Sequence, residues 1–227
     1  MTDLGPSAKR RLPAGQRREA MLTAAAEFFA EHGLDASTRD VAEALGVTQA
    51  LIYKHFASKE DLIEQTLAHA FAPPNEADGP WIDFEGSLHD GLLKYYSHLA
   101  ARTSHQRMRL FIRAGLDGRS WPTRRGHALT QRLFIPLIAA LRDKAGLANL
   151  SDRPPMRGER ELCMMLHASV VFLGIRRHVY GMEMPDDLSD VVALYVKTFL
   201  DGAEPALRRL HEAGAESLSV RLATPGK

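Results

Sequence analysis

The sequence predicts an all-α protein, and three observations lead to this prediction. Apolar residues recur with the 3.6-residue period of amphipathic helices, in segments of roughly 10 to 25 residues. Glycine, proline and aspartate punctuate these segments, as in PPNEADGP and SDRPP, and alternating strand patterns are nearly absent. The chain has 227 residues, 45% of them hydrophobic and 25% charged, which is enough to build a core without disulfide support.

The first helices are short and closely spaced. Ser37 or Thr38 can cap the second of them, and Asp40 follows in its first turn, where a carboxylate favours the positive end of the helix. Gly33 offers a left-handed stop to the helix before it. The expected helices here are 17–32, 37–45, 48–55 and one that begins after the cap residue Ser58.

Longer helices are expected in the rest of the chain. They follow the loop after residue 71 and cover 83–102, 105–117, 124–146, 157–180 and 187–213. The sequence therefore divides into a disordered basic arm (1–16), a compact helical domain (17–71) and a larger helical domain (83–215).

The most informative stretch is STRDVAEALGVTQALIYKHFASKEDL, residues 37–62. Ala42 is small where two helices cross closely, and Gly46 suits a turn with positive φ. Val41, Leu45, Val47 and Ile52 have the spacing that closes a small core. This pattern predicts a helix-turn-helix, in which the helix over 48–55 enters the DNA major groove.

The outward residues of 48–55 suit this task because they include hydrogen-bond donors and no acid. The Gln49 amide can pair with adenine, while Ala50 and Leu51 offer apolar surface to a thymine methyl group. Tyr53, His55 and Lys59 are better placed for phosphates, with Lys59 beside the N–H groups that begin the next helix. A three-helix packing of this kind also occurs in proteins that never touch DNA, so this alternative stays open.

The window from Arg17 to about Leu67 resembles the DNA-binding domain of the TetR (tetracycline-repressor) family of bacterial transcription regulators. The resemblance rests on the helix that ends in EHG, the STRDVAEALGV entry, the LIYKHF helix and the SKEDL opening. It implies base contacts from the second and third helices and phosphate contacts around them. The implied base contacts are Arg39, Thr48, Gln49, Ala50 and Leu51, and the implied phosphate contacts are Thr38, Tyr53, Lys54, His55 and Lys59.

The same resemblance implies that residues 83–215 bind a small-molecule effector and form a homodimer through the helices over 157–180 and 187–213. Their apolar period is that of a packed helix pair, which is also what an ordinary core shows. The expected interface residues are Leu162, Leu166, Val170, Leu173, Val191, Tyr195 and Phe199. The expected pocket residues are Phe84, Tyr95, Met108, Phe111, Ile112, Trp121 and Phe134, each of which also fits ordinary core.

Two basic segments have more than one interpretation. The arm KRRLPAGQRR either reaches a neighbouring minor groove or phosphate, or serves as a solubilising tail. The arginine-rich stretch 102–132 either forms a solvated face or marks an anionic effector.

Several function classes lack their signatures. The histidines and the single cysteine, Cys163, do not have metal-ligand spacing, and no nucleotide-binding or hydrolase motif is present. We therefore expect no cofactor, no metal and no enzymatic activity. Without a signal sequence or a span of about 18 apolar residues, a cytoplasmic protein is expected. The sequence favours a repressor released from a palindromic operator by an effector, and the alternative is a small-molecule-binding helical bundle, possibly enzymatic, that does not bind DNA.

Overall fold

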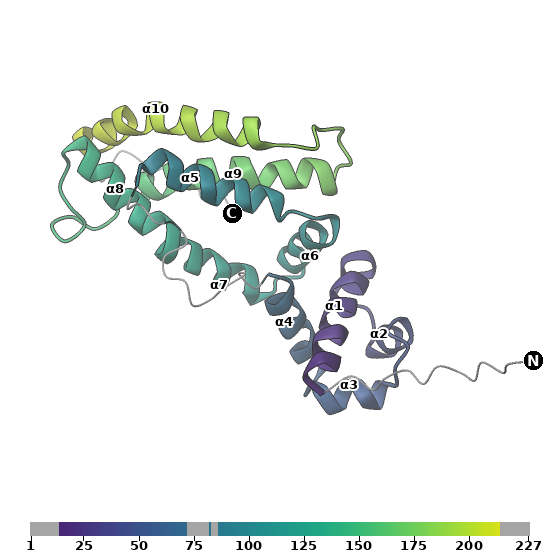
Figure 1. Cartoon of the computed structure of the whole chain (residues 1–227). Coiled ribbons are helices and arrows are strands. Elements are labelled where there is room, and N and C mark those ends of the chain that lie inside the picture. Colours follow the sequence, from purple (N-terminus) through teal and green to yellow (C-terminus); the bar gives the residue numbers. More distant parts are fainter. Residues whose placement is uncertain (1–13, 72–81, 83–85, 214–227) are drawn as a thin grey trace, which may run out of the picture. The chain divides into compact units, whose positions relative to one another are not determined.

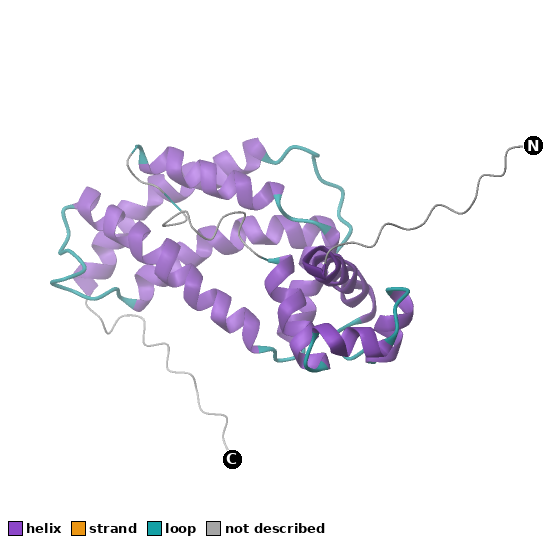
Figure 2. Cartoon of the chain, turned by 60° about the horizontal axis from the view of Figure 1, so that its bottom comes forward, coloured by secondary structure: helices purple, strands orange, loops and turns teal. Residues whose placement is uncertain are grey.

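The computed structural model describes residues 14–71, 82 and 86–213, and every regular element among them is helical (Figure 2). The prediction of an all-α fold is thereby confirmed. The elements are α1 (Ala14–His32), α2 (Thr38–Ala44), α3 (Gln49–His55), α4 (Lys59–Ala70), α5 (Leu88–Ala101), α6 (His105–Leu116), α7 (Ser120–Leu129), η1 (Thr130–Phe134), α8 (Ile135–Ala145), α9 (Arg157–His178) and α10 (Ser189–Ala213). Residues 1–13 of the expected basic arm lie outside the described residues, whereas residues 14–16, also expected in the disordered arm, form the first turn of α1.

The helix expected over 124–146 is interrupted by one π-helical turn, η1. The Ile135 amide donates to the Thr130 carbonyl, which is one residue farther back than in an α-helix. Pro136 follows directly, and it lacks an N–H and crowds the preceding turn of a regular helix. The wider turn accommodates this proline, so that α7, η1 and α8 follow one another without a loop.

The contacts divide the chain into two units. Unit 1 contains the described residues within Met1–Pro74 together with Arg109–Gly118, and unit 2 contains those within Asn75–Met108 and Arg119–Lys227. The division expected from the sequence assigned all of 83–215 to the second domain. The structure instead assigns most of α6 to unit 1.

Unit 1 is built around α1, which packs along α4, while α2 packs against α3 (Figure 1). Its core contains Phe29, Ile52 and Leu67, all nearly inaccessible to solvent. Phe71 at the end of α4 meets the Phe111 ring edge-on, with the centroids 6.2 Å apart. A fully buried side chain of this size stabilises the fold by about 1.5–3 kcal/mol.

Two arginines of α6 hold the end of α1 in unit 1. The Nε atom of Arg109 donates to the Ala30 carbonyl at 3.2 Å, and Arg113 Nη2 donates to the Glu31 carbonyl at 2.8 Å. Both carbonyls belong to the last turn of α1, which has no intrahelical partners for such groups. Gly33 follows with φ +91°, and a Cβ there would come within 2.8 Å of Arg113 Nη1. The backbone angle favours glycine at this position, and a larger residue would also displace the Arg113 guanidinium.

Unit 2 packs α5, α8, α9 and α10 around one core, with α9 and α10 side by side (Figure 1). The largest buried side chain in this unit is Arg142 of α8, which is 0% exposed. Its guanidinium makes a bidentate pair with Glu159 of α9, at 2.7 and 2.6 Å. His211 Nε2 of α10 lies 3.0 Å from the same carboxylate. This Arg142 cluster joins three helices.

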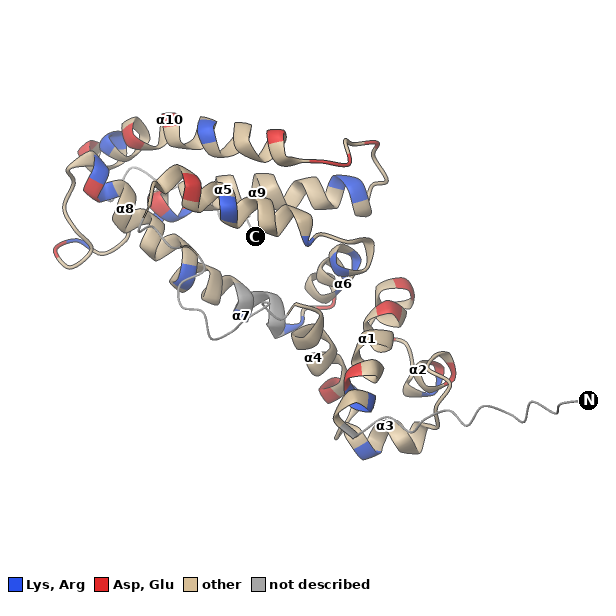
Figure 3. Cartoon of the chain, viewed as in Figure 1, with Lys and Arg blue, Asp and Glu red and all other residues tan. Residues whose placement is uncertain are grey.

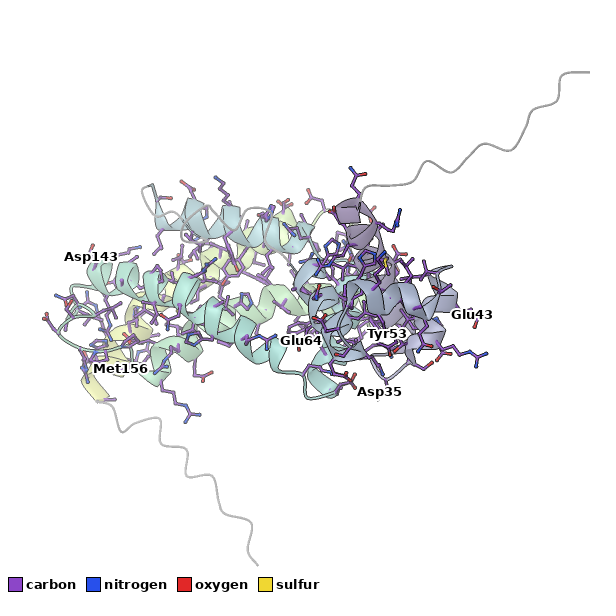
Figure 4. All side chains as sticks on the ribbon, turned by 90° about the horizontal axis from the view of Figure 1, so that it is seen from below. Asp35, Glu43, Tyr53, Glu64, Asp143 and Met156 are labelled. Atoms are coloured by element: carbon purple, nitrogen blue, oxygen red, sulfur yellow. The ribbon has the colours of Figure 1, made fainter. Side chains whose placement is uncertain are left out.

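The Arg142 cluster also fixes the segment between α8 and α9. Arg142 donates to the carbonyls of Arg153 and Pro154, at 2.6 and 3.1 Å. The Met156 amide donates to the Glu159 carboxylate at 2.8 Å. Figure 4 labels Asp143 and Met156, which flank this segment. The buried charges are thus fully hydrogen-bonded, which is the condition for burying them.

Candidate nucleic-acid interface

The entry to α2 is fixed by reciprocal hydrogen bonds. Ser37 Oγ accepts from the Asp40 amide at 3.2 Å, and the Asp40 carboxylate accepts from the Ser37 amide at 3.1 Å. The hydrogen bond from the Ser37 side chain, together with that from its amide, lowers the pKa of Asp40. Gly46, with φ +63°, forms the turn that follows α2. Of the two caps that the sequence allowed, Ser37 and Thr38, the structure uses Ser37, and Gly46 forms the expected turn with positive φ.

Helix α3 presents most of its surface to solvent. Thr48 caps it, with Oγ1 accepting from the Leu51 amide at 3.2 Å, and Ile52 alone is buried. Gln49, Ala50 and Lys54 are exposed, whereas Leu51 and His55 are half-buried. The helix carries a lysine and no acidic residue (Figure 3). Its exposed face therefore offers donors without a charge that repels phosphate.

Thr38 and Tyr53, both expected to contact phosphate, are hydrogen-bonded to each other in the structure. The Tyr53 hydroxyl of α3 lies 3.2 Å from Thr38 Oγ1 of α2. Thr38 is buried, and Tyr53, labelled in Figure 4, is 47% exposed. The hydrogen bond holds the Tyr53 hydroxyl at the junction of α2 and α3. Arg39, expected to reach a base, is exposed on α2.

The start of α4 differs from the anion site that the sequence suggested. Lys59 Nζ donates to the Asp35 carbonyl at 2.8 Å and so ties α4 to the turn after α1. The Asp61 carboxylate accepts from the Ala57 amide at 2.8 Å and from Gln65 Nε2 at 2.6 Å. Both hydrogen bonds lower the pKa of Asp61, and the one from Gln65 has the larger effect. The Asp61 carboxylate therefore lies at the first turn of α4, where the sequence suggested a bound phosphate.

Arg18 has a role that the sequence did not reveal. Its guanidinium lies over the Phe56 ring, 5.5 Å from the centroid, and its Nη2 donates to Gln65. Arg18 lies in α1, as the expected helix over 17–32 has it, and the new finding is its packing against Phe56, the residue that ends α3. The exposed Arg18 is thereby oriented by a cation–π contact.

The expected pocket residues are divided between the two units. Phe111 and Ile112 belong to unit 1, whereas Tyr95, Met108 and Phe134 belong to unit 2. Met108 and Phe134 are buried and Tyr95 is half-buried. Phe84 lies outside the described residues, as does the side chain of Trp121.

The expected interface residues divide into two groups. Leu166, Val170, Leu173 and Phe199 are buried in the core of their own unit, and Leu162, Val191 and Tyr195 pack partly buried against it. Other large apolar side chains of α9 and α10 are exposed. We name four of them, Met164, Met165, Phe172 and Leu194, the α9–α10 stripe. The helical period of the sequence marks the apolar face of each helix, but it does not tell whether that face packs inside its own unit or against a second copy of the chain.

Other kinds of site lack support in the described part of the chain. Residues 14–71, 82 and 86–213 contain no group of acids, histidines or cysteine arranged to hold a metal ion. None of the helices in those ranges combines the length and apolarity needed to cross a membrane. Burial raises the pKa of the Cys163 thiol to about 12, which keeps it protonated and unreactive.

Comparisons with known proteins bear on both units. Residues 21–66 match the family model described as bacterial regulatory proteins, tetR family. The HTH-type transcriptional repressor KstR2 of Mycobacterium tuberculosis (strain ATCC 25618 / H37Rv) is 47% identical over 52 residues, or 22% of this chain. The match spans about a quarter of that relative's length (26%).

Solved structures extend the likeness in fold over most of the chain. A TetR-like transcriptional regulator from Rhodococcus sp. RHA1 has a TM-score of 0.60 at 17% identity, over 85% of this chain and 100% of that one. The ketosteroid transcriptional regulator KstR2 of Mycobacterium tuberculosis has a TM-score of 0.54 at 18% identity, over 85% and 96%. At such identities the likeness concerns the fold alone.

Proposed function

We propose that this protein is a DNA-binding transcriptional repressor of the tetR family of bacterial regulatory proteins, whose family model residues 21–66 match. The observation that carries the proposal is α3, an exposed, acid-free helix held by its cap and by the Tyr53–Thr38 hydrogen bond. A helix so presented fits the DNA major groove, with its N-terminal residues at the base edges. The 47% identity to a repressor, KstR2, favours repression over activation.

The proposed reading residues lie at the start of α3. Gln49 is exposed and acts as the adenine-reading side chain, with Ala50 beside it for a thymine methyl group. Thr48 and Leu51 flank them, and Arg39 reaches a base from α2. Lys54, His55 and the Tyr53 hydroxyl hold the phosphate backbone, which fixes the register of the helix. Thr38 acts with Tyr53, and Lys59 reaches a phosphate only by leaving the Asp35 carbonyl.

The repressor is proposed to act as a homodimer through the α9–α10 stripe. Met165, Phe172 and Leu194 are 55, 47 and 61% exposed, which is unusual for apolar side chains of this size. A two-fold axis at this stripe would place the same patch of both chains in contact. The dimer would then read a palindromic operator with two copies of α3.

Release is proposed to follow from an effector that binds unit 2 more tightly in the conformer with poor DNA affinity. The proposal assigns the chain no catalytic role and a cytoplasmic location. The alternative is a helical bundle that binds a small molecule and does not bind DNA. Steep salt dependence of duplex binding separates the two, because a repressor displaces counterions from phosphate.

The test is a selection of bound fragments from a random duplex library with the full chain at about 150 mM salt. A two-fold-symmetric motif is the expected result. If the folded protein, free of co-purified ligand, enriches no motif, the helical-bundle alternative replaces the repressor.

Replacing Gln49 by alanine is expected to weaken binding to the selected operator by about 1–3 kcal/mol and to relax preference at one base pair of each half-site. The reason is the loss of the bidentate amide contact. Affinities for the operator and for its three base variants at that position measure the effect. An unchanged preference at every position would remove Gln49 from the reading role.

Lys54→Ala is the matched variant on the same helix. It removes a phosphate contact, so it should weaken all duplexes alike and lower the slope of log affinity against log salt by about 1 for each copy of α3 on the duplex. A change in base preference in this variant, or no change in the slope, would contradict the division of roles within α3.

A further inference from the structure

The hydroxyl of Tyr96 on α5 lies inside unit 2 without a hydrogen-bond partner. The residue is 0% exposed, and its Oη meets no donor or acceptor among the described residues. Burying an unpaired hydroxyl costs free energy, and folded proteins rarely retain one. A phenylalanine would fill the same space at lower cost. Packing alone therefore does not account for the hydroxyl.

The surroundings of the Tyr96 hydroxyl keep it protonated. Burial raises the pKa of Tyr96 well above its usual value, and the neighbouring Tyr95 and Cys163 raise it further. The phenol is consequently neutral at any physiological pH and has an O–H to donate. The Tyr95 ring stands edge-on to it, with the centroids 5.0 Å apart. An oxygen acceptor is the natural partner for a donor of this kind.

The π-helical turn η1, which accommodates Pro136, lies close to the same side chain. The His167 ring of α9 is 6.0 Å from the Tyr96 ring and also 6.0 Å from the Phe134 ring. Phe134 is the last residue of the π-helical turn η1. Turns of this type are frequent at functional sites, because they depart from the regular hydrogen-bond pattern of the helix. The His167 ring thus lies between Tyr96, which carries the unpaired hydroxyl, and Phe134 of the π-helical turn.

The charges of the described core restrict what can bind there. The core around Tyr96 is apolar, with Leu92, Leu133 and Val170 among its buried members. The fully buried charged side chains of the described residues are Arg142 and Glu159, and these pair with each other. A charged ligand beside Tyr96 would find both of these side chains already paired, and burying it without a counter-charge would cost several kcal/mol. An uncharged, mainly apolar ligand avoids this cost.

We propose that unit 2 binds an uncharged, mainly apolar effector beside α5, α9 and η1, and that the Tyr96 hydroxyl donates a hydrogen bond to a carbonyl or ether oxygen of that effector. This inference rests on the proposed function, in which unit 2 receives an effector. It names the chemical class of that effector and the side chain that recognises its oxygen.

The first experiment uses Nile red, an uncharged apolar dye with a single carbonyl oxygen whose fluorescence responds to hydrogen bonding. The full chain should bind it saturably. Tyr96→Phe should weaken this binding about tenfold, the equivalent of one hydrogen bond, and shift the emission to shorter wavelength. Tyr180→Phe is the control, because Tyr180 is 63% exposed and lies after the end of α9; it should leave binding unchanged.

The second experiment compares the thermal stability of the ligand-free variants. Because Tyr96→Phe removes an unpaired buried hydroxyl, its Tm should rise by about 2–4 °C while dye binding falls. A merely structural hydroxyl would give the opposite sign, since its loss would lower the Tm. The combination of higher stability and weaker binding is therefore specific to a ligand-recognising role.

Three outcomes would overturn the inference: no saturable binding of Nile red, equal binding by Tyr96→Phe, or a lower Tm of that variant. The anionic dye 1-anilinonaphthalene-8-sulfonate tests the ligand class. Its binding should not depend on Tyr96, and a dependence as strong as that of Nile red would contradict an uncharged ligand. Operator binding is measured on the same preparations, so that failure of the repressor proposal is seen separately from failure at Tyr96.

Discussion

Replacing Glu159 by alanine is expected to lower the free energy of unfolding by about 3–5 kcal/mol, because it leaves the Arg142 guanidinium buried and without its counter-charge. Arg142 is 0% exposed, so neither water nor another carboxylate can compensate without opening the core. The variant also loses the bonds to the Met156 amide and to His211. Urea unfolding followed by circular dichroism measures the change.

Glu161→Ala is the matched control on the same helix. Glu161 is exposed, and its replacement should change the free energy of unfolding by no more than about 0.5 kcal/mol. A similar small loss in Glu159→Ala would mean that the Arg142 cluster contributes little to stability.

The same carboxylate predicts a pH dependence. Burial alone would raise the pKa of Glu159, but the hydrogen bonds from Arg142, His211 and the Met156 amide outweigh it and hold the pKa below its usual value. Its contribution is therefore complete above the unfolded pKa, about 4.3, and is lost as the pH falls through the lower folded value. The stability difference between the wild type and Glu159→Gln should accordingly shrink on acidification, and a constant difference would contradict this assignment.

Met165→Glu is expected to convert the protein to a monomer and to reduce operator affinity by roughly 10² to 10⁴-fold. At a two-fold interface the substitution places a carboxylate on both chains of the α9–α10 stripe, so that two charges are buried against an apolar surface. A single copy of α3 then binds each half-site without the second copy to retain it. Sedimentation equilibrium measures the assembly, and operator titration measures the affinity.

Leu116→Glu serves as the control, since Leu116 is 81% exposed at the end of α6 and outside the stripe. It should remain dimeric with unchanged operator affinity. A Met165→Glu protein that stays dimeric would place the interface elsewhere, and a monomeric wild type would end the dimer proposal.

The helix-turn-helix was predictable because each of its elements leaves a local signal. Ser37, Gly46 and Ser58 act through neighbours within a few residues, and the structure has caps and a turn at these positions. The resemblance to the TetR family, made on residues 17 to 67, is confirmed by the family model over 21–66.

The rest depended on contacts between residues far apart in the sequence. The inward face of α9 is chosen by its neighbours α5, α8 and α10, which is why Val170 and Leu173 are core rather than surface. The Lys59 side chain reaches back to Asp35, and no local pattern announces that bond. The base contacts and the interface residues stay predictions until they are measured.

The placement of Arg109–Gly118 in unit 1 has a consequence for dissecting the protein. A fragment that ends near residue 71 contains the whole sequence match to the family, yet it lacks the two guanidinium groups that cap the last turn of α1 and the ring that meets Phe71. The part of the chain proposed to read DNA is therefore a discontinuous folding unit. Transferring this unit to another protein requires residues Arg109–Gly118 as well, a segment that begins nearly forty residues after residue 71.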